Sequence, residues 1–202
     1  MTKRRGFQSD LATILAGVGA TVTVLNGPEA ATTANIVANG SERQLAVEKF
    51  FTPDLELPSE ALLTSISVPF LQDGELFKTY RTAIRPINSH ALTNAAFRVK
   101  MQKEPLQVAS AQLVFGALES RESGGPIRAS GTEAAIVGKA PDEATLAAAV
   151  AALVAEPWFP RTGSSASSRS ATFTRCFTPC KTSLMGIWMH RCSASLRAPS
   201  AR

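Results

Sequence analysis

The chain has 202 residues, enough for one large domain or two small ones, and its hydrophobic fraction of 45% suits a packed core. Its net charge of +5 suggests nucleic-acid binding, but the charge is unevenly placed. Up to Glu156 there are 14 Lys plus Arg and 16 Asp plus Glu, whereas from Pro157 onward there are seven basic residues and no acidic one. The basic charge therefore belongs to the tail, which argues against nucleic acid as a partner of the folded body.

The sequence also argues against a membrane protein and against a protein stabilised by disulfides. No apolar run approaches the ~20 residues that a membrane span needs, and the N-terminus is too polar for a signal peptide. All three cysteines (Cys176, Cys180 and Cys192) lie in the tail, so no disulfide framework is predicted for the body. We expect a soluble, cytoplasmic protein without a membrane partner.

The first predicted element is a short helix. Ser9 is a favourable N-cap, and Gly17 and Gly19 end the helix. Its apolar residues recur at helical spacing and predict a buried face made of Leu11, Ile14, Leu15 and Val18. A strand over 20–25 follows, and small polar residues at 29–41 indicate a loop.

Five further strands and two helices are predicted beyond that loop. The strands cover residues 43–47, 62–68, 76–84, 91–101 and 108–118. Thr132 and Glu133 can cap a short helix that ends at Gly138, and Pro141 begins a longer helix that ends before Pro157. After Trp158 the sequence is rich in Ser and Arg and lacks periodicity, so we expect a disordered tail.

Three polar features could carry chemistry, and each has a plainer interpretation. Asp10 at a helix start could accept sugar hydroxyls, although a capping role in the first turn is the commoner one. Arg81 and Arg85 could grip a phosphate or carboxylate, although arginines at a strand end are usually solvated. His90 has no second ligand at a recognisable spacing, so it is interpreted as a surface or loop-anchoring residue.

Common catalytic and metal motifs are absent or weak. There is no Gly-x-Gly-x-x-Gly, no Walker loop and no arguable catalytic triad. Cys176 and Cys180, followed by His190 and Cys192, supply enough soft ligands for zinc, but their setting in the tail makes this a weak zinc signal.

Several blocks in order resemble one family. The stretch 1–15, with Ser9-Asp10-Leu11 in it, resembles the flavin domain of plant-type aldehyde oxidases, and so does 77–86 with Asn88 and 91–97. The runs 62–69 and 113–118 are also similar. The resemblance runs from about Met1 to Glu156 and identifies the chain with the aldehyde oxidase and xanthine dehydrogenase family of molybdenum hydroxylases.

This resemblance implies a cofactor set and three site residues. The family uses molybdopterin, two 2Fe-2S clusters and FAD, and passes electrons from molybdenum through the clusters to FAD, then to oxygen or NAD. Asp10 matches the acid that binds the ribityl or phosphate-linked region of FAD. Leu63 matches a leucine that packs near the isoalloxazine, and Arg81 matches a position that is lysine in xanthine dehydrogenases. No catalytic residue or metal ligand is implied.

The resemblance also implies an organisation. We expect an α+β fold, with the C-terminal part of an FAD-binding (PCMH-type) subdomain at 1–70. A CO dehydrogenase flavoprotein C-terminal-like domain with a three-stranded antiparallel sheet follows at 71–157, and the tail covers 158–202. The family's Gly-rich pyrophosphate loop would lie upstream of Met1, so a fragment is expected.

The implied partners are the iron–sulfur and molybdopterin domains of the parent enzyme, in a homodimer. Two alternatives stay open. The first is a truncated, non-enzymatic remnant or scaffold without flavin binding. The second is a nucleic-acid arm formed by the basic tail.

Overall fold

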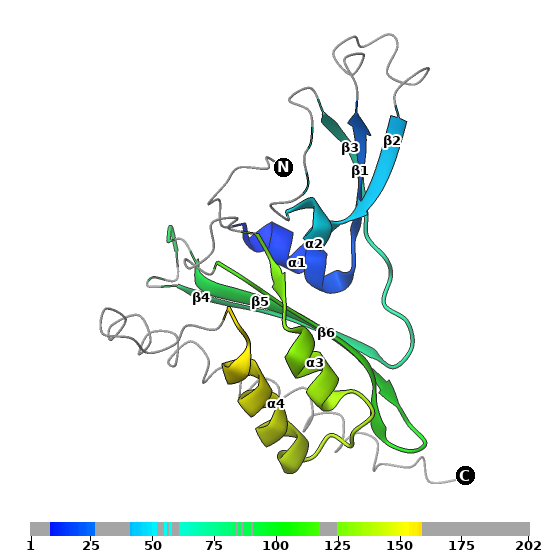
Figure 1. Cartoon of the computed structure of the whole chain (residues 1–202), viewed down its shortest axis with the longest axis vertical. Helices are drawn as coiled ribbons and strands as arrows, with labels where there is room; N and C mark the ends of the chain where they lie inside the picture. Colours follow the sequence, from blue (N-terminus) through cyan, green and yellow to red (C-terminus); the bar gives the residue numbers. More distant parts are fainter. Residues whose placement is uncertain are drawn as a thin grey trace, which may run out of the picture.

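The computed structural model describes residues 9–26, 41–51, 55, 57, 61–83, 85, 87–89, 91–117 and 125–158. These residues form two antiparallel sheets and four helices, which confirms the α+β class (Figure 1). The predicted disordered tail, the loop at 29–41 except Ser41, and His90 lie outside the described residues. No helix in the described ranges is long and apolar enough to cross a membrane.

The N-terminal sheet has the strand order β2-β1-β3. Strand β1 (Thr21–Asn26) is central, and β2 (Ser41–Ala46) and β3 (Leu62–Ser67) pair with it in antiparallel register. Val22 and Val24 of β1 are buried against helix α1 (Asp10–Val18) and the short helix α2 (Val47–Phe50). β-Branched residues suit this strand because their side chains pack well on a pleated surface.

The C-terminal sheet has the order β4-β5-β6-β7, with β4 at Glu75–Ala83, β5 at Ala91–Gln102, β6 at Gln107–Gly116 and β7 at Ile127–Arg128. The prediction of three strands is therefore wrong, because β7 adds a fourth. Its two residues pair with Val114 and Phe115. A strand this short carries no alternating pattern, so periodicity could not predict it.

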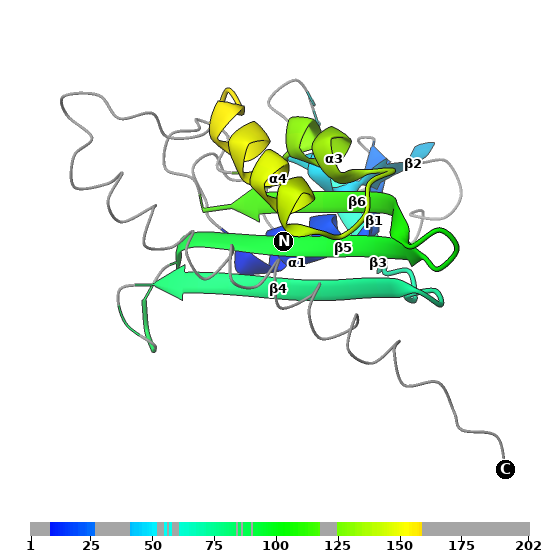
Figure 2. The same cartoon turned by 90° about the horizontal axis from the view of Figure 1, so that it is seen from below.

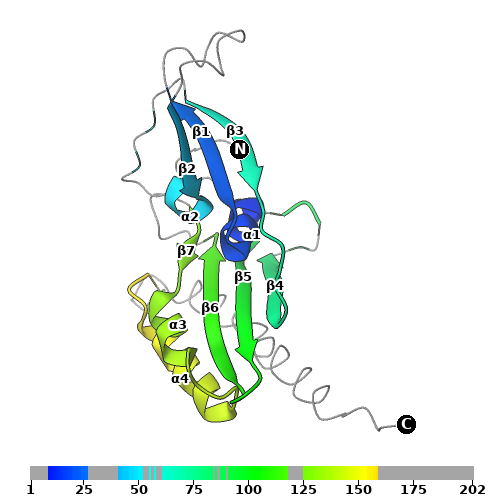
Figure 3. The ribbon, with the colours of Figure 1, turned by 90° about the vertical axis from the view of Figure 1, so that its right-hand side faces the viewer.

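Helices cover both faces of the C-terminal sheet. Figure 1 shows α1 on one face and the pair α3 (Ser130–Ile136) and α4 (Glu143–Ala155) on the other. Figure 2 shows β4, β5 and β6 side by side beneath that helix pair. In Figure 3, α1 lies between the two sheets, so it joins the halves of the fold.

The side chains of β5 alternate between the two faces of the C-terminal sheet, so this strand packs against helices on both sides. Ala95, Phe97 and Val99 are buried in the cluster formed with α3 and α4. On the other face, Arg98 donates to the carbonyl of Val18 (2.9 Å) in α1, and Ala96 is fully buried.

An aromatic row crosses the α3–α4 side of the sheet. Tyr80, Phe97, Phe115 and Trp158 follow one another at centroid distances of 5.5, 5.4 and 5.4 Å. Such tilted and edge-on pairs stabilise a core beyond their buried area.

The predicted apolar face of the first helix is partly wrong. Leu11 is 56% exposed and Ile14 is 37% exposed, whereas Ala12, Ala16 and Gly17 are buried. The physical reason is close packing: a β-carbon added at Gly17 would lie 2.3 Å from the β-carbon of Ala96. Leu15 and Val18 are buried as predicted, but where the helix backbone approaches β5 closely only a residue as small as Gly17 fits.

The helix starts are also corrected. Helix α3 begins at Ser130, so Thr132 and Glu133 lie inside its first turn and do not precede it. The cap of α4 is Asp142, whose carboxylate accepts from the backbone N–H of Thr145 (2.7 Å) and thereby lowers the pKa of Asp142. Pro141 precedes that cap. The first helix ends at Val18 with Gly19 in the left-handed conformation (φ 80°), while Gly17 is internal.

Candidate functional site

The site begins at the N-terminus of α1. Ser9 is extended (φ −116°, ψ 113°), and its hydroxyl accepts from the backbone N–H of Ala12 (3.2 Å), which confirms it as the N-cap. Asp10 is the first helical residue. A carboxylate is favoured there because the free N–H groups give the helix start a partial positive charge.

Arg81 of β4 meets Asp10 across 71 residues of sequence. Its Nε donates to Asp10 Oδ2 at 2.8 Å, and its Nη2 donates to the carbonyl of Ser89. The Asp10 and Arg81 side chains are 40% and 38% exposed. The structure therefore brings together two of the three site residues expected from the sequence, and leaves both open to solvent.

Asn94 of β5 completes this cluster and was not predicted as a site residue. It donates from Nδ2 to Asp10 Oδ1 and is 96% buried by residue area, since its relative exposure is 4%. It is the direct cross-strand partner of Arg81 on β4 and of Gly116 on β6. In the sequence, Asn94 stood out only as part of the block 91–97 that resembles the family.

Gly116 makes the space for this arrangement. A β-carbon there would lie 2.0 Å from Thr13 Oγ1 and 2.4 Å from Asn94 Oδ1. No side chain fits between α1 and β6 at this point, so glycine allows the start of α1 to reach the sheet.

Leu63 lies apart from the polar cluster. It is a partly buried residue of β3, pairs with Val24, and packs against the apolar cluster that contains Ala12 and Leu15. Its strand belongs to the N-terminal sheet, whereas Arg81 belongs to the C-terminal sheet, with α1 between them (Figure 3).

The second arginine of the predicted pair does not join Asp10. Arg85 Nη2 donates to the carbonyl of Asn88 (3.3 Å), a residue with φ 53°. His90 and the proposed zinc ligands of the tail lie outside the described residues. Within the part of the chain that the structure describes, no group of three His, Cys, Asp or Glu residues could hold a metal.

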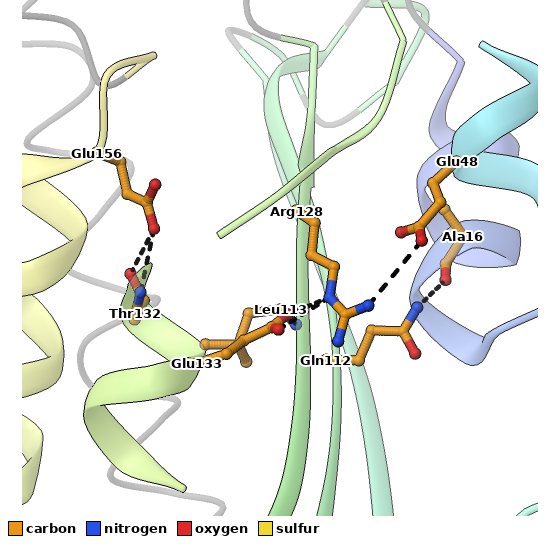
Figure 4. A network of polar contacts seen from close by, with 8 residues as sticks. All are labelled: Ala16, Glu48, Gln112, Leu113, Arg128, Thr132, Glu133 and Glu156. Carbon is orange, nitrogen blue, oxygen red and sulfur yellow. Dashed lines mark hydrogen bonds and ion pairs between the residues drawn. The ribbon is translucent and has the colours of Figure 1, made fainter. Parts of the chain in front are cut away.

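A separate polar network fixes the layers behind the site (Figure 4). Glu133 accepts from the backbone N–H of Leu113 (2.7 Å) and from Arg128 Nε (2.8 Å). The bond between Glu133 and Arg128 raises the pKa of Arg128. Gln112 Nε2 donates to the carbonyl of Ala16 in α1 (2.8 Å). Strand β6 thus holds α3 on one face and α1 on the other.

The start of α3 has a cap supplied from elsewhere. Glu156, at the end of α4, accepts from the backbone N–H of Thr132 at 3.1 Å. This carboxylate lies where a helix start favours negative charge.

Comparison with known proteins assigns the family. Residues 78–172 match the family model described as the CO dehydrogenase flavoprotein C-terminal domain. The indole-3-acetaldehyde oxidase of Arabidopsis thaliana is 31% identical over 166 residues, which cover 76% of this chain and 11% of that protein. The probable aldehyde oxidase 1 of Oryza sativa subsp. japonica is 33% identical over 146 residues, covering 69% and 10%.

The fold is also similar to that of a solved structure. The quinoline 2-oxidoreductase from Pseudomonas putida 86 superposes with a TM-score of 0.56 at 22% identity, over 88% of this chain and 57% of that one. The chain belongs to the molybdenum hydroxylase family and corresponds to part of its flavoprotein domain. It spans about a tenth of the length of the curated relatives it matches.

Proposed function

We propose that this chain is an FAD-holding, electron-transfer segment of an aldehyde-oxidising molybdenum hydroxylase. The observation that carries the proposal is the Asp10–Arg81 pair, a half-exposed anion and cation joined at 2.8 Å at the start of α1. The curated relatives are named as aldehyde oxidases, which supports aldehydes as the substrate class. The electron donors would be iron–sulfur and molybdopterin domains, and oxygen or NAD would be the acceptor.

The residues present fit such a cofactor. Asp10 offers carboxylate oxygens at the start of α1, which suit the hydroxyl donors of a ribityl chain. Arg81 Nη1 makes no hydrogen bond to another described residue, so this nitrogen is available to an anionic partner. Leu63 offers an apolar contact on the opposite side of α1.

When bound, FAD would supply a two-electron acceptor. Arg81 would stabilise negative charge that develops on its reduced ring, because the guanidinium keeps its charge at every physiological pH. Asp10 would orient the chain of the cofactor, and Leu63 would exclude water from one side of the ring. The division into a subdomain at 1–70 and a domain at 71–157 belongs to this proposal.

A fluorescence titration of FAD against the full chain tests the proposal. We expect quenching on binding, and an affinity loss of about tenfold or more in D10N and in R81Q, since each removes a charge-assisted hydrogen bond. R85Q is the matched control, because Arg85 contacts only the carbonyl of Asn88 among the described residues, and it is expected to stay within about twofold.

Absence of binding by the full chain, with or without the cluster and molybdenum parts of a relative supplied, would refute flavin binding. A folded protein without flavin affinity would then support the scaffold alternative. Equal losses in R81Q and R85Q would show that general positive charge, and not the Asp10–Arg81 pair, attracts the cofactor.

A further inference from the structure

Asp10 is the functional carboxylate of the proposed site, and both of its oxygens are held. Arg81 Nε donates to Oδ2, and Asn94 Nδ2 donates to Oδ1. With a donor on each oxygen, the carboxylate plane cannot rotate without breaking one of the two bonds. One lone pair of each oxygen remains for a ligand.

The two donors differ in what they can contribute. Arg81 is half exposed and charged, so it can also serve a ligand directly. Asn94 is neutral and almost wholly buried, so its only role toward a ligand would pass through Asp10. We propose that Asn94 is a positioning residue, which orients the Asp10 carboxylate toward FAD without touching the cofactor. This inference rests on the proposed function.

The sheet is built to hold Asn94 in this orientation. Arg81, Asn94 and Gly116 form one row across β4, β5 and β6. Gly116 leaves room for Thr13 beside Asn94 Oδ1, and that oxygen has no hydrogen-bond partner among the described residues. An unpaired buried amide oxygen costs free energy, whereas the Nδ2 of the same amide has its acceptor in Asp10.

A neutral amide is required at this position for an electrostatic reason. The charged groups on this face of the sheet, among the described residues, form three sets. Asp10 and Arg81 lie beside Asn94, and a second set lies at the far end of β4 and β5: Glu75, Arg98 and Lys100. Arg128 of β7 and Glu48 of α2 form the third, on the side of β6 away from Asn94. Glu75 and Arg98 pair with one another at 2.7 Å. A second carboxylate at position 94 would therefore face Asp10 with Arg81 alone to balance both.

Replacing Asn94 with aspartate tests this requirement, because the affinity for FAD should then depend on pH. Two adjacent carboxylates share a proton, and one of the two apparent pKa values rises. In N94D the shared proton lets position 94 donate to Asp10 at about pH 5, whereas by about pH 8 the proton is lost and the carboxylates repel. FAD affinity of N94D should therefore fall about tenfold or more between these pH values, with a smaller change in the unsubstituted chain.

The matched control is an amide that holds the same helix elsewhere. Gln112 donates to the Ala16 carbonyl near the C-terminus of α1 and does not contact Asp10. We expect N94A to weaken FAD binding by the full chain about tenfold and Q112A to leave it within about twofold. Equal losses, or an N94D profile that parallels the unsubstituted chain, would overturn the inference.

A readout without flavin separates this inference from the proposed function. Exchange of the Arg81 Nε proton with water, followed by nitrogen-15 NMR of the full chain, reports how well Asp10 is held. N94A should accelerate this exchange several-fold, and Q112A should not. If no chain binds FAD but N94A alone accelerates exchange, the positioning role stands and the flavin proposal fails; unchanged exchange in N94A overturns the positioning role.

Discussion

Gly17 offers the sharpest test of how α1 meets the C-terminal sheet. In G17A the new β-carbon would lie 2.3 Å from Ala96 Cβ and 3.0 Å from the Ala96 carbonyl oxygen, so the helix must move away from β5 by more than an ångström. Overpacking of this kind costs up to about 3 kcal/mol. Alanine offsets about 1 kcal/mol of that through its higher helix propensity. The expected net loss is about 2 kcal/mol.

Thermal and urea unfolding followed by circular dichroism measure this loss. For a chain of this size, about 2 kcal/mol corresponds to a decrease of about 4–8 °C in the melting temperature. The compensating double variant G17A/A96G is the control, because it removes the methyl group that the new β-carbon meets. It should be more stable than the sum of the two single effects predicts, by at least about 1 kcal/mol. A G17A chain as stable as the original, or strictly additive effects, would refute the close approach of α1.

Three other perturbations have expected outcomes. E133A should lower the free energy of unfolding by about 2 kcal/mol in urea titration, because it leaves the buried N–H of Leu113 without its acceptor and removes the acceptor of Arg128 Nε; a loss below about 1 kcal/mol would contradict this role. S9A should cost about 1 kcal/mol and S9D much less, as expected of an N-cap; equal losses would argue against capping. The pKa of Glu75 is lowered, first by the backbone N–H of Gln72 and then by Arg98. Its ionised form therefore stabilises the fold above the unfolded pKa near 4.5. That stabilisation is lost as the pH falls through the lower pKa of the folded state. Stability measured between about pH 5 and pH 2 should therefore fall less steeply in E75Q, and an unchanged slope would contradict this linkage.

The sequence predicted most elements, but it could not predict which small residues face the sheet. Apolar periodicity assigned Leu11 and Ile14 to the core, because size usually decides burial. Here the distance between helix and sheet decides, and only a residue as small as Gly17 fits against Ala96. The long strands were found from their alternation, whereas β7 is too short to alternate.

The candidate site was only partly accessible from the sequence. Asp10 and Arg81 are 71 residues apart, and nothing in composition or spacing pairs them; the family resemblance named both, and the fold then joined them. Asn94 was visible only as part of that resemblance. Its role depends on cross-strand register with Arg81 and Gly116, which single-sequence patterns do not encode.

The contact between Glu156 and the start of α3 has a consequence for how the molecule opens. Glu156 directly follows α4 and accepts from the first turn of α3. Fraying at the end of α4 therefore removes the cap of α3. The helix pair therefore constitutes one cooperative unfolding unit, although the two segments have separate hydrogen-bond ladders. Native-state hydrogen exchange should therefore return a common opening free energy for the Thr132 amide and the last turn of α4.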